Sequence, residues 1–196
     1  MQQGLEVTPL LQAAYNTFPA GKLAEHTVVE VAEFMRARLA VLLQNDYAHD
    51  EVAAVLGGAT HNLGEVADKL KAVAEFKKLP EAAALAAANK RVHNLLKKTD
   101  ADALPEVAEP LLQLPQEKAL FAATQNLSAH IHQALEAKDF QAALAVLAGI
   151  KPKVDAFFDE VMVMDKDEAV RNNRLALLKD LSAQMNAVAD ISLLND

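Results

Sequence analysis

Basic and amide side chains between residues 82 and 99 are the groups best suited to chemistry in this sequence. This segment contains no acid, although the chain carries a formal net charge of −8. On a helical wheel, Lys90, Asn94, Lys97 and Lys98 share one face, and the apolar side chains share the opposite face. Lysines neutralise phosphates and asparagine amides read base edges, so these side chains are of the kind that contacts nucleic acid. A solvated basic face is the alternative interpretation.

Arg174 stands out on the last predicted helix because it falls within the core-facing stripe, close to Val170. A guanidinium near a core needs a partner, since an unpaired buried charge is costly. We expect either an ion pair with an internal acid, such as Asp155 or Asp159, or a place for Arg174 at the rim of a ligand groove.

Other reactive residues give no catalytic pattern. The chain has six histidines and no cysteine. His130 and His132 are two residues apart, so they point away from each other on a helix. His49-Asp50 resembles half of a metal-binding histidine–aspartate pair, which leaves a metal-dependent hydrolase as one hypothesis. We expect no catalytic residue, no metal and no cofactor in this segment.

Composition indicates an all-α, globular helical bundle. Hydrophobic residues make up 52% of the chain, and alanine, the strongest helix former, is abundant. The longest apolar run, 82–88, is far too short to span a bilayer, and the amino end does not resemble a signal peptide. Together with the lack of cysteine, this predicts a cytoplasmic protein with no membrane partner.

Periodic apolar residues predict helices at about 28–44, 50–57, 64–78, 80–98, 116–137, 140–149, 152–162 and 168–189. We expect the second of these to end at Gly57-Gly58 in a left-handed residue. We expect residues 1–26 to form a linker-like lead-in and residues 27–98 to form an amino-terminal helical sub-bundle. Residues 99–196 are expected to form a second helical bundle, which begins with the proline-containing connection 99–115. The two sub-bundles could pack together.

Four segments, in this order, resemble the carboxy-terminal region of the β subunit of bacterial glycyl-tRNA synthetase. They are AALAAANKRVHNLLKK at 83–98, VDAFFDEVMVM at 154–164, NRLALLKDL at 173–181 and ADISLL at 189–194. FPAGKL at 18–23 and the helix at 28–43 add to the similarity, which spans about 18–194. The run RLALL at 174–178 also resembles the helical anticodon-binding domain called DALR, so 99–196 is expected to be a DALR-like bundle.

The resemblance implies recognition of the anticodon arm of the tRNA for glycine. It also implies that the chain is part of a longer β subunit, which assembles with an α subunit as α2β2. In that family the α subunit binds ATP and glycine and the β subunit holds the tRNA. Asn89, Lys90, Arg91, Asn94, Arg171, Asn173 and Arg174 are carried over as tRNA-binding residues, and Lys97 and Lys98 are added from the charge pattern. The alternative function is a helical protein-interaction scaffold with a basic docking face.

Overall fold

The computed structural model describes residues 6–58 and 62–194. Within these ranges the only pairing between extended segments is one isolated antiparallel bridge, Glu6 to Asn62. The first five α-helices are α1 (Val7–Tyr15), α2 (Thr27–Leu43), α3 (His49–Gly57), α4 (Val66–Lys77) and α5 (Ala82–Leu96). The later ones are α6 (Pro115–Glu136), α7 (Phe140–Ala148), α8 (Lys151–Glu160) and α9 (Glu168–Met185). The predicted all-α fold is confirmed.

Short polar and proline signals place several helix starts. Asp167 accepts hydrogen bonds from the backbone N–H groups of Ala169 and Val170 at the start of α9, and Asp139 does the same for Ala142 in α7. Side-chain oxygens at these positions satisfy amides that the helix itself leaves unpaired. Pro115 occupies the first position of α6, where its missing N–H costs nothing.

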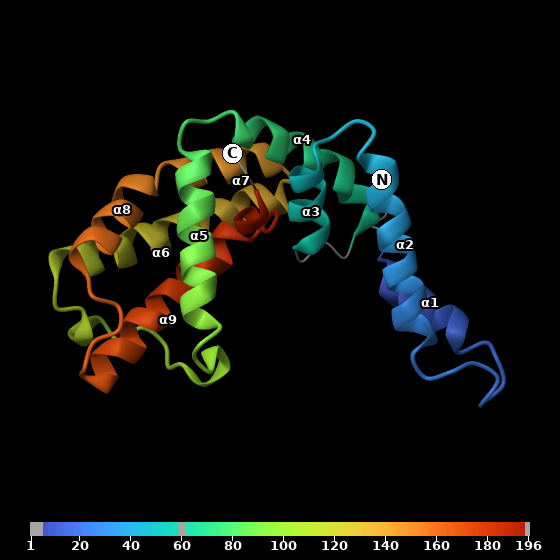
Figure 1. Cartoon of the computed structure of the whole chain (residues 1–196), viewed down its shortest axis with the longest axis horizontal. Coiled ribbons are helices and arrows are strands. Elements are labelled where there is room, and N and C mark those ends of the chain that lie inside the picture. The colour runs from blue at the N-terminus through green and yellow to red at the C-terminus, as the bar shows by residue number, and fades with distance from the viewer. Residues whose placement is uncertain (1–5, 59–61, 195–196) are drawn as a thin grey trace.

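α9 is the central helix of the body. Its buried residues run along nearly its whole length, and Leu177, Leu178, Leu181 and Met185 are fully buried. α5 and α6 pack against it, α7 and α8 pack against α6, and α4 packs against α7 (Figure 1). One hydrophobic cluster extends from Val52 in α3 to Leu194, so helices from both predicted sub-bundles share a core. The proposed boundary between residues 98 and 99 stays a prediction.

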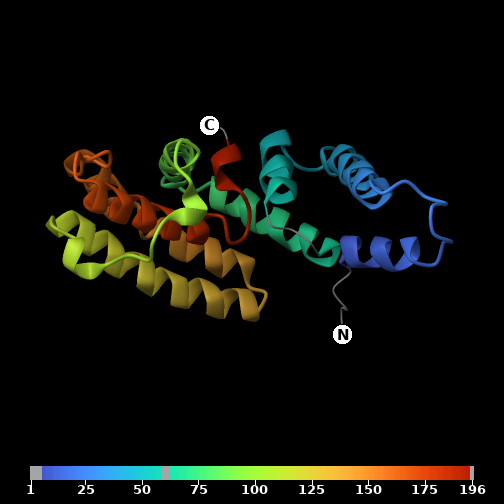
Figure 2. The same cartoon turned by 90° about the horizontal axis from the view of Figure 1, so that it is seen from below.

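The amino-terminal segment differs from the predicted linker-like lead-in because it contains α1. α1 packs against α2, and the two helices form a hairpin that projects from the body (Figures 1 and 2). α1 was not predicted because Pro9 lies inside it. The proline falls in the first turn of the helix, where it is tolerated.

Two other details were predicted incorrectly. Gly58 has a φ of −77°, so α3 does not end in a left-handed residue. The glycine instead allows close approach: a Cβ at Gly58 would lie 3.1 Å from the backbone nitrogen of Asp190 and 3.3 Å from the Cα of Ala189. The final helix ends at Met185, and the chain continues into the 3₁₀ turn η4 (Ile191–Leu193).

The connection between α5 and α6 contains two 3₁₀ turns, η2 (Ala101–Ala103) and η3 (Glu109–Leu111). It lies against α9, where Lys179 Nζ donates to the carbonyl oxygen of Ala101 at 2.7 Å. Among the described residues, none of the helices combines the length and apolarity needed to cross a bilayer.

Candidate nucleic-acid interface

The basic face of α5 is solvent-exposed, as the charge pattern predicted. Lys90, Asn94, Lys97 and Lys98 are all exposed. Leu85 and Val92, on the opposite side of the helix, are fully buried and fix its orientation. Within residues 6–58 and 62–194, the ion pairs found do not involve these three lysines. Their ammonium groups are therefore available to an anion.

Arg91 lies beside this face and contacts α8. Its guanidinium carbon lies 4.2 Å from the centroid of the Phe158 ring, a cation–π geometry. Stacking restricts the side chain but leaves the N–H groups at the guanidinium edge free to donate to a phosphate. Phe158 was not singled out from the sequence.

Asn89 does not lie on the exposed face of α5, so its position gives the predicted contact with tRNA no support. The side chain is fully buried between α5 and α9. Its Nδ2 donates to Asn186 Oδ1 at 2.7 Å, and Ser182 Oγ donates to its Oδ1 at 3.4 Å. Asn89 therefore fixes α5 against α9. Asparagine type and spacing gave no sign of this, since its partners are almost a hundred residues later.

Asn173 is also buried, so its position likewise does not support a contact with tRNA. Its Oδ1 accepts from the backbone N–H of Ala108 at 2.7 Å, and its Nδ2 donates to the carbonyl of the same residue at 3.2 Å. The side-chain amide thus pairs with one peptide unit of the 99–115 connection. Its effect is to hold that connection against α9.

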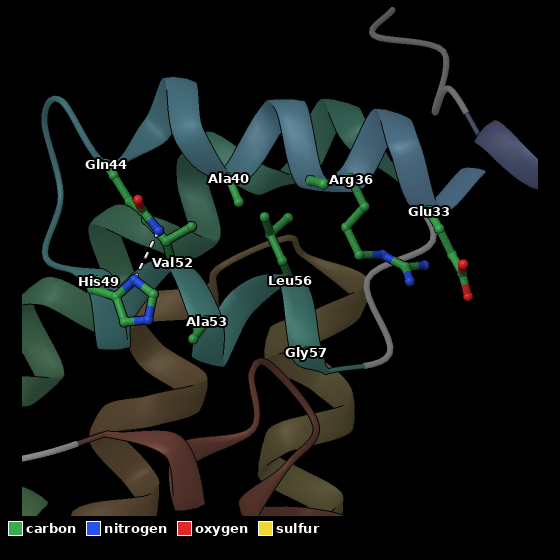
Figure 3. A pocket seen from close by; sticks show the side chains of 10 residues that line it. Glu33, Arg36, Ala40, Gln44, His49, Val52, Ala53, Leu56 and Gly57 are labelled. Carbon is green, nitrogen blue, oxygen red and sulfur yellow. Dashed lines mark hydrogen bonds between the residues drawn. The ribbon is translucent and has the colours of Figure 1, made fainter. Parts of the chain in front are cut away.

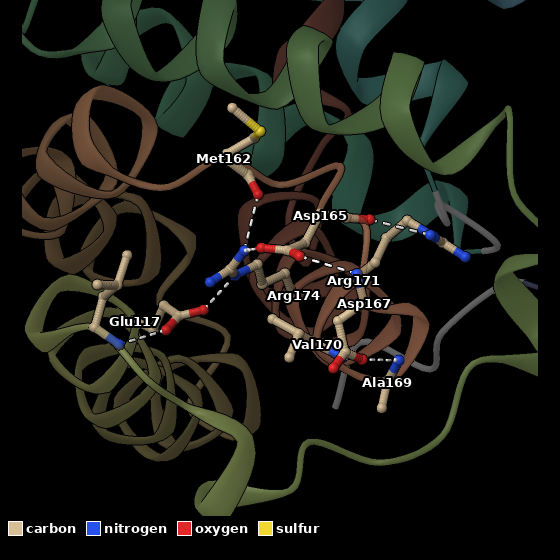
Figure 4. A network of polar contacts seen from close by, with 9 residues as sticks. Glu117, Met162, Asp165, Asp167, Ala169, Val170, Arg171 and Arg174 are labelled. Carbon is tan, nitrogen blue, oxygen red and sulfur yellow. Dashed lines mark hydrogen bonds and ion pairs between the residues drawn. The ribbon is translucent and has the colours of Figure 1, made fainter.

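Arg174 of α9 is buried next to the start of α6 and the α8–α9 connection. Its guanidinium has three hydrogen-bond acceptors there (Figure 4). Its Nε donates to Glu117 Oε1 at 2.5 Å, and its Nη1 donates to the Met162 carbonyl at 2.9 Å and to Asp165 Oδ2 at 2.7 Å. The expected pairing with an internal acid is confirmed, but the acids are Glu117 and Asp165. Of the two acids suggested as examples, Asp155 pairs with Lys151. Arg174 therefore organises the interior, and its position gives the predicted contact with tRNA no support.

The same network sets the charge state of its members. Burial alone would lower the pKa of the Arg174 guanidinium, but hydrogen bonds to Glu117 and Asp165 outweigh burial and raise it. The backbone N–H of Asp167 and the Arg174 side chain both donate to Asp165, which lowers the pKa of that carboxyl below its ordinary value of 3.8. Both groups are thereby held in their charged forms.

Arg171 is partly exposed at the amino end of α9. Its Nη1 donates to the carbonyl oxygen of Asp165 at 3.1 Å, as Figure 4 shows. Glu168, one turn earlier, lies 4.0 Å from its Nη2. Nine residues were predicted as site residues. Five of them lie exposed on α5: Lys90, Arg91, Asn94, Lys97 and Lys98. Arg171 is half-buried on α9, and Asn89, Asn173 and Arg174 are buried.

His49 and Asp50 do not form a common site. His49 Nδ1 lies 2.8 Å from Gln44 Nε2 at the edge of a cavity of about 360 Å³ between α2 and α3 (Figure 3). Asp50 Oδ2 instead lies 2.6 Å from Lys77 Nζ on α4. The two side chains have different partners, so the geometry gives the hydrolase hypothesis no support.

Residues 85–191 match the model of a family described as the DALR anticodon binding domain, and this is more than half of the 196 residues. The chain belongs to the DALR anticodon binding domain family. The matched range begins within α5 and ends at η4, so it contains the basic face and all three buried polar residues described above.

Individual relatives have a more specific name. The glycine–tRNA ligase β subunit of Neisseria meningitidis serogroup C (strain 053442) is 62% identical over all 196 residues, which cover 28% of that relative. A Neisseria gonorrhoeae sequence of the same name is 64% identical over 127 residues, 65% of this chain and 100% of that relative. The Nitrosomonas europaea β subunit is 48% identical over 166 residues, 84% of this chain and 23% of the relative. The resemblance drawn from the sequence is confirmed, and the chain spans little more than a quarter of the longer relatives.

Proposed function

We propose that this chain binds the anticodon arm of the tRNA for glycine, as part of the β subunit of a glycine–tRNA ligase. The observation that carries the proposal is the DALR match over 85–191, which includes the exposed basic face of α5. The names of the relatives supply the amino acid.

In this proposal the exposed α5 side chains bind the tRNA. Lys90, Lys97, Lys98 and Arg91 neutralise phosphates and fix the position of the arm. Asn94 donates to or accepts from base edges and Arg171 donates to them, because anticodon loops present unstacked bases. Asn89, Asn173 and Arg174 act indirectly, by holding α5, the 99–115 connection and the α8–α9 connection in place.

The rest of the ligase would supply the chemistry. By resemblance, an α subunit binds ATP and glycine, and α and β subunits assemble as α2β2. A part of the ligase that only holds tRNA needs no cofactor of its own. A role in charging tRNA also implies a cytoplasmic location.

A binding titration tests the proposal. Labelled tRNA for glycine, a variant with its anticodon swapped, and a tRNA for another amino acid are titrated with the chain at fixed low salt. We expect tightest binding to the first. The double variant Lys90→Glu/Lys97→Glu reverses two charges on α5 and should weaken binding by at least about tenfold.

The matched control is Lys118→Glu/Lys153→Glu, which makes the same charge change at exposed lysines on α6 and α8. It should bind nearly as well as the parent, with circular dichroism verifying the fold of both variants. Equal weakening in the two would mean that only net charge matters. Absence of tRNA binding together with capture of an acidic protein by the α5 face would favour the interaction scaffold.

A further inference from the structure

The α1–α2 hairpin presents apolar side chains to solvent on a scale that the rest of the molecule does not. Within the described residues of α1 and α2, no side chain is buried. Phe34 is 60% exposed, Val41 63% and Leu42 64%. A helix that packs on one side normally turns its polar side outward, so α2 has an apolar surface left without a partner.

These side chains form a continuous surface. Phe34 and Val41 are seven residues apart, and therefore lie in line along the outer side of α2. Met35 and Leu42 lie next to them and line a groove of about 370 Å³ that extends to Val7 of α1 and to Leu63. Charged groups flank the line: Arg38 lies over the Phe34 ring at 5.3 Å from its centroid, and Glu30 is one turn earlier. An apolar centre with charged groups at its edge is typical of a protein interface.

The hairpin is separate from the tRNA-binding part of the chain. It precedes the DALR match by more than forty residues, and it projects from the body formed by α4 to α9 (Figure 2). The hairpin surface carries both acidic and basic groups and no basic cluster. Such a surface is not suited to binding a polyanion such as tRNA.

We propose that this hairpin surface, defined by Phe34, Met35, Val41 and Leu42, is covered by a part of the glycine–tRNA ligase β subunit that lies outside these 196 residues. The relatives that match the whole chain are far longer, and 72% of the Neisseria meningitidis β subunit lies beyond the match (100 − 28). A segment of the same polypeptide has a high effective concentration at this surface. A second copy has no such advantage and brings another net charge of −8.

The experiment compares labelling of one introduced cysteine in two settings. The natural sequence has no cysteine, so Val41→Cys gives a unique thiol of similar size on the hairpin surface. The variant is studied as the 196-residue chain, and within the Neisseria meningitidis β subunit with its matched region replaced by this chain. Labelling by a maleimide is followed site by site by mass spectrometry. Val146→Cys, exposed on α7, is the control.

We expect Cys labelling at position 41 to be at least about tenfold slower in the full-length protein, with little change at position 146. Equal rates at position 41 in the two settings would overturn the proposal. The proposal would also be overturned if labelling of the isolated chain at position 41 became slower as the chain concentration rises, because a second copy would then cover the surface. Amide hydrogen exchange makes the same comparison without an introduced cysteine. It is measured in α2 of the isolated chain and in the matching segment of the native Neisseria meningitidis β subunit. Equally fast exchange in both would also overturn the proposal. The inference rests on the proposed function in taking the chain as part of a β subunit; no tRNA is involved, so its failure and a failure of tRNA binding are distinguishable.

Discussion

At the scale of single residues, burial separates the polar groups that hold the fold together from those that can bind a ligand. Arg174 and Lys97 are both cations in the region first singled out for tRNA binding, yet one is 3% exposed and the other lies open to solvent. Their substitutions should therefore affect different measurements.

Arg174→Met should destabilise the fold by about 3–5 kcal/mol, because it leaves the buried Glu117 carboxylate without its cation. Urea unfolding at pH 7 measures this. Adding Glu117→Leu removes the orphaned charge, so the double variant should lose less than the sum of the two single variants. An additive result would mean that the two side chains are not energetically coupled.

Asp165→Asn should lower the melting temperature at pH 7, and the difference from the parent should shrink in acid. The pKa of the Asp165 carboxyl is lowered in the folded state, so its stabilising effect is present above the ordinary value of 3.8. That effect is lost as the pH falls through the lower, folded-state pKa. Melting curves between pH 7 and pH 3 test this, with the exposed Asp159→Asn as control; a gap that stays constant with pH would contradict the assignment.

Lys97→Ala and Lys98→Ala should weaken tRNA binding through the salt-dependent component alone. If the α5 face neutralises about four phosphates, log Kd should change with log salt at a slope near 2.8, with about 0.7 from each contact. A fourfold rise in salt then weakens binding roughly 50-fold. Each variant should reduce the slope by about 0.7 and leave the preference among anticodons unchanged. A changed preference would place these lysines at bases.

The sequence was informative about these residues only where exposure followed from helical periodicity. Lys90, Asn94, Lys97 and Lys98 were placed correctly because one wheel relates them to the buried Leu85. The burial of Asn89 and Asn173 was not foreseen because their partners, Asn186 and Ala108, are distant in sequence. Burial of a polar side chain depends on such tertiary pairs, which no local pattern reveals.

At the scale of elements, the contact between α3 and the end of the chain depends on Gly58. Gly58→Ala should destabilise the protein by about 1–3 kcal/mol, because the new Cβ meets the backbone of Ala189 and Asp190, which cannot move as a side chain can. The control is Gly149→Ala, whose Cβ would make only an ordinary contact of 3.4 Å. Denaturant unfolding measures both, and equal stability of the two variants would refute the close-approach argument.

Helix positions followed closely from apolar spacing, because most helices bury one stripe. The helix expected at 64–78 is α4, and the one expected at 116–137 is α6. Prediction failed where tertiary contacts replace local signals. α1 was missed because Pro9 lies in its first turn. α9 ends at Met185 because the chain then turns back to cover α5 and α3.

At the scale of the whole molecule, the chain should bind tRNA without activating an amino acid. A DALR domain binds the anticodon, and the match accounts for most of the body of the structure. A preparation free of host synthetase should therefore give no glycine-dependent pyrophosphate exchange. Exchange above background that copurifies with the chain, and is lost in a variant that unfolds it, would contradict this assignment.

The hydrogen bond from the backbone N–H of Asp190 to the carbonyl of Ala54, at 2.8 Å, joins residues 136 positions apart (190 − 54). Ala189 and Ile191, on either side of Asp190, are fully buried. During synthesis α3 is therefore made well before its cover: at roughly 5–20 residues per second the delay is about 7–27 seconds. Over that interval the side of α3 that packs against η4 is exposed to solvent, so this part of the core is completed only after residues 189–191 have been synthesised.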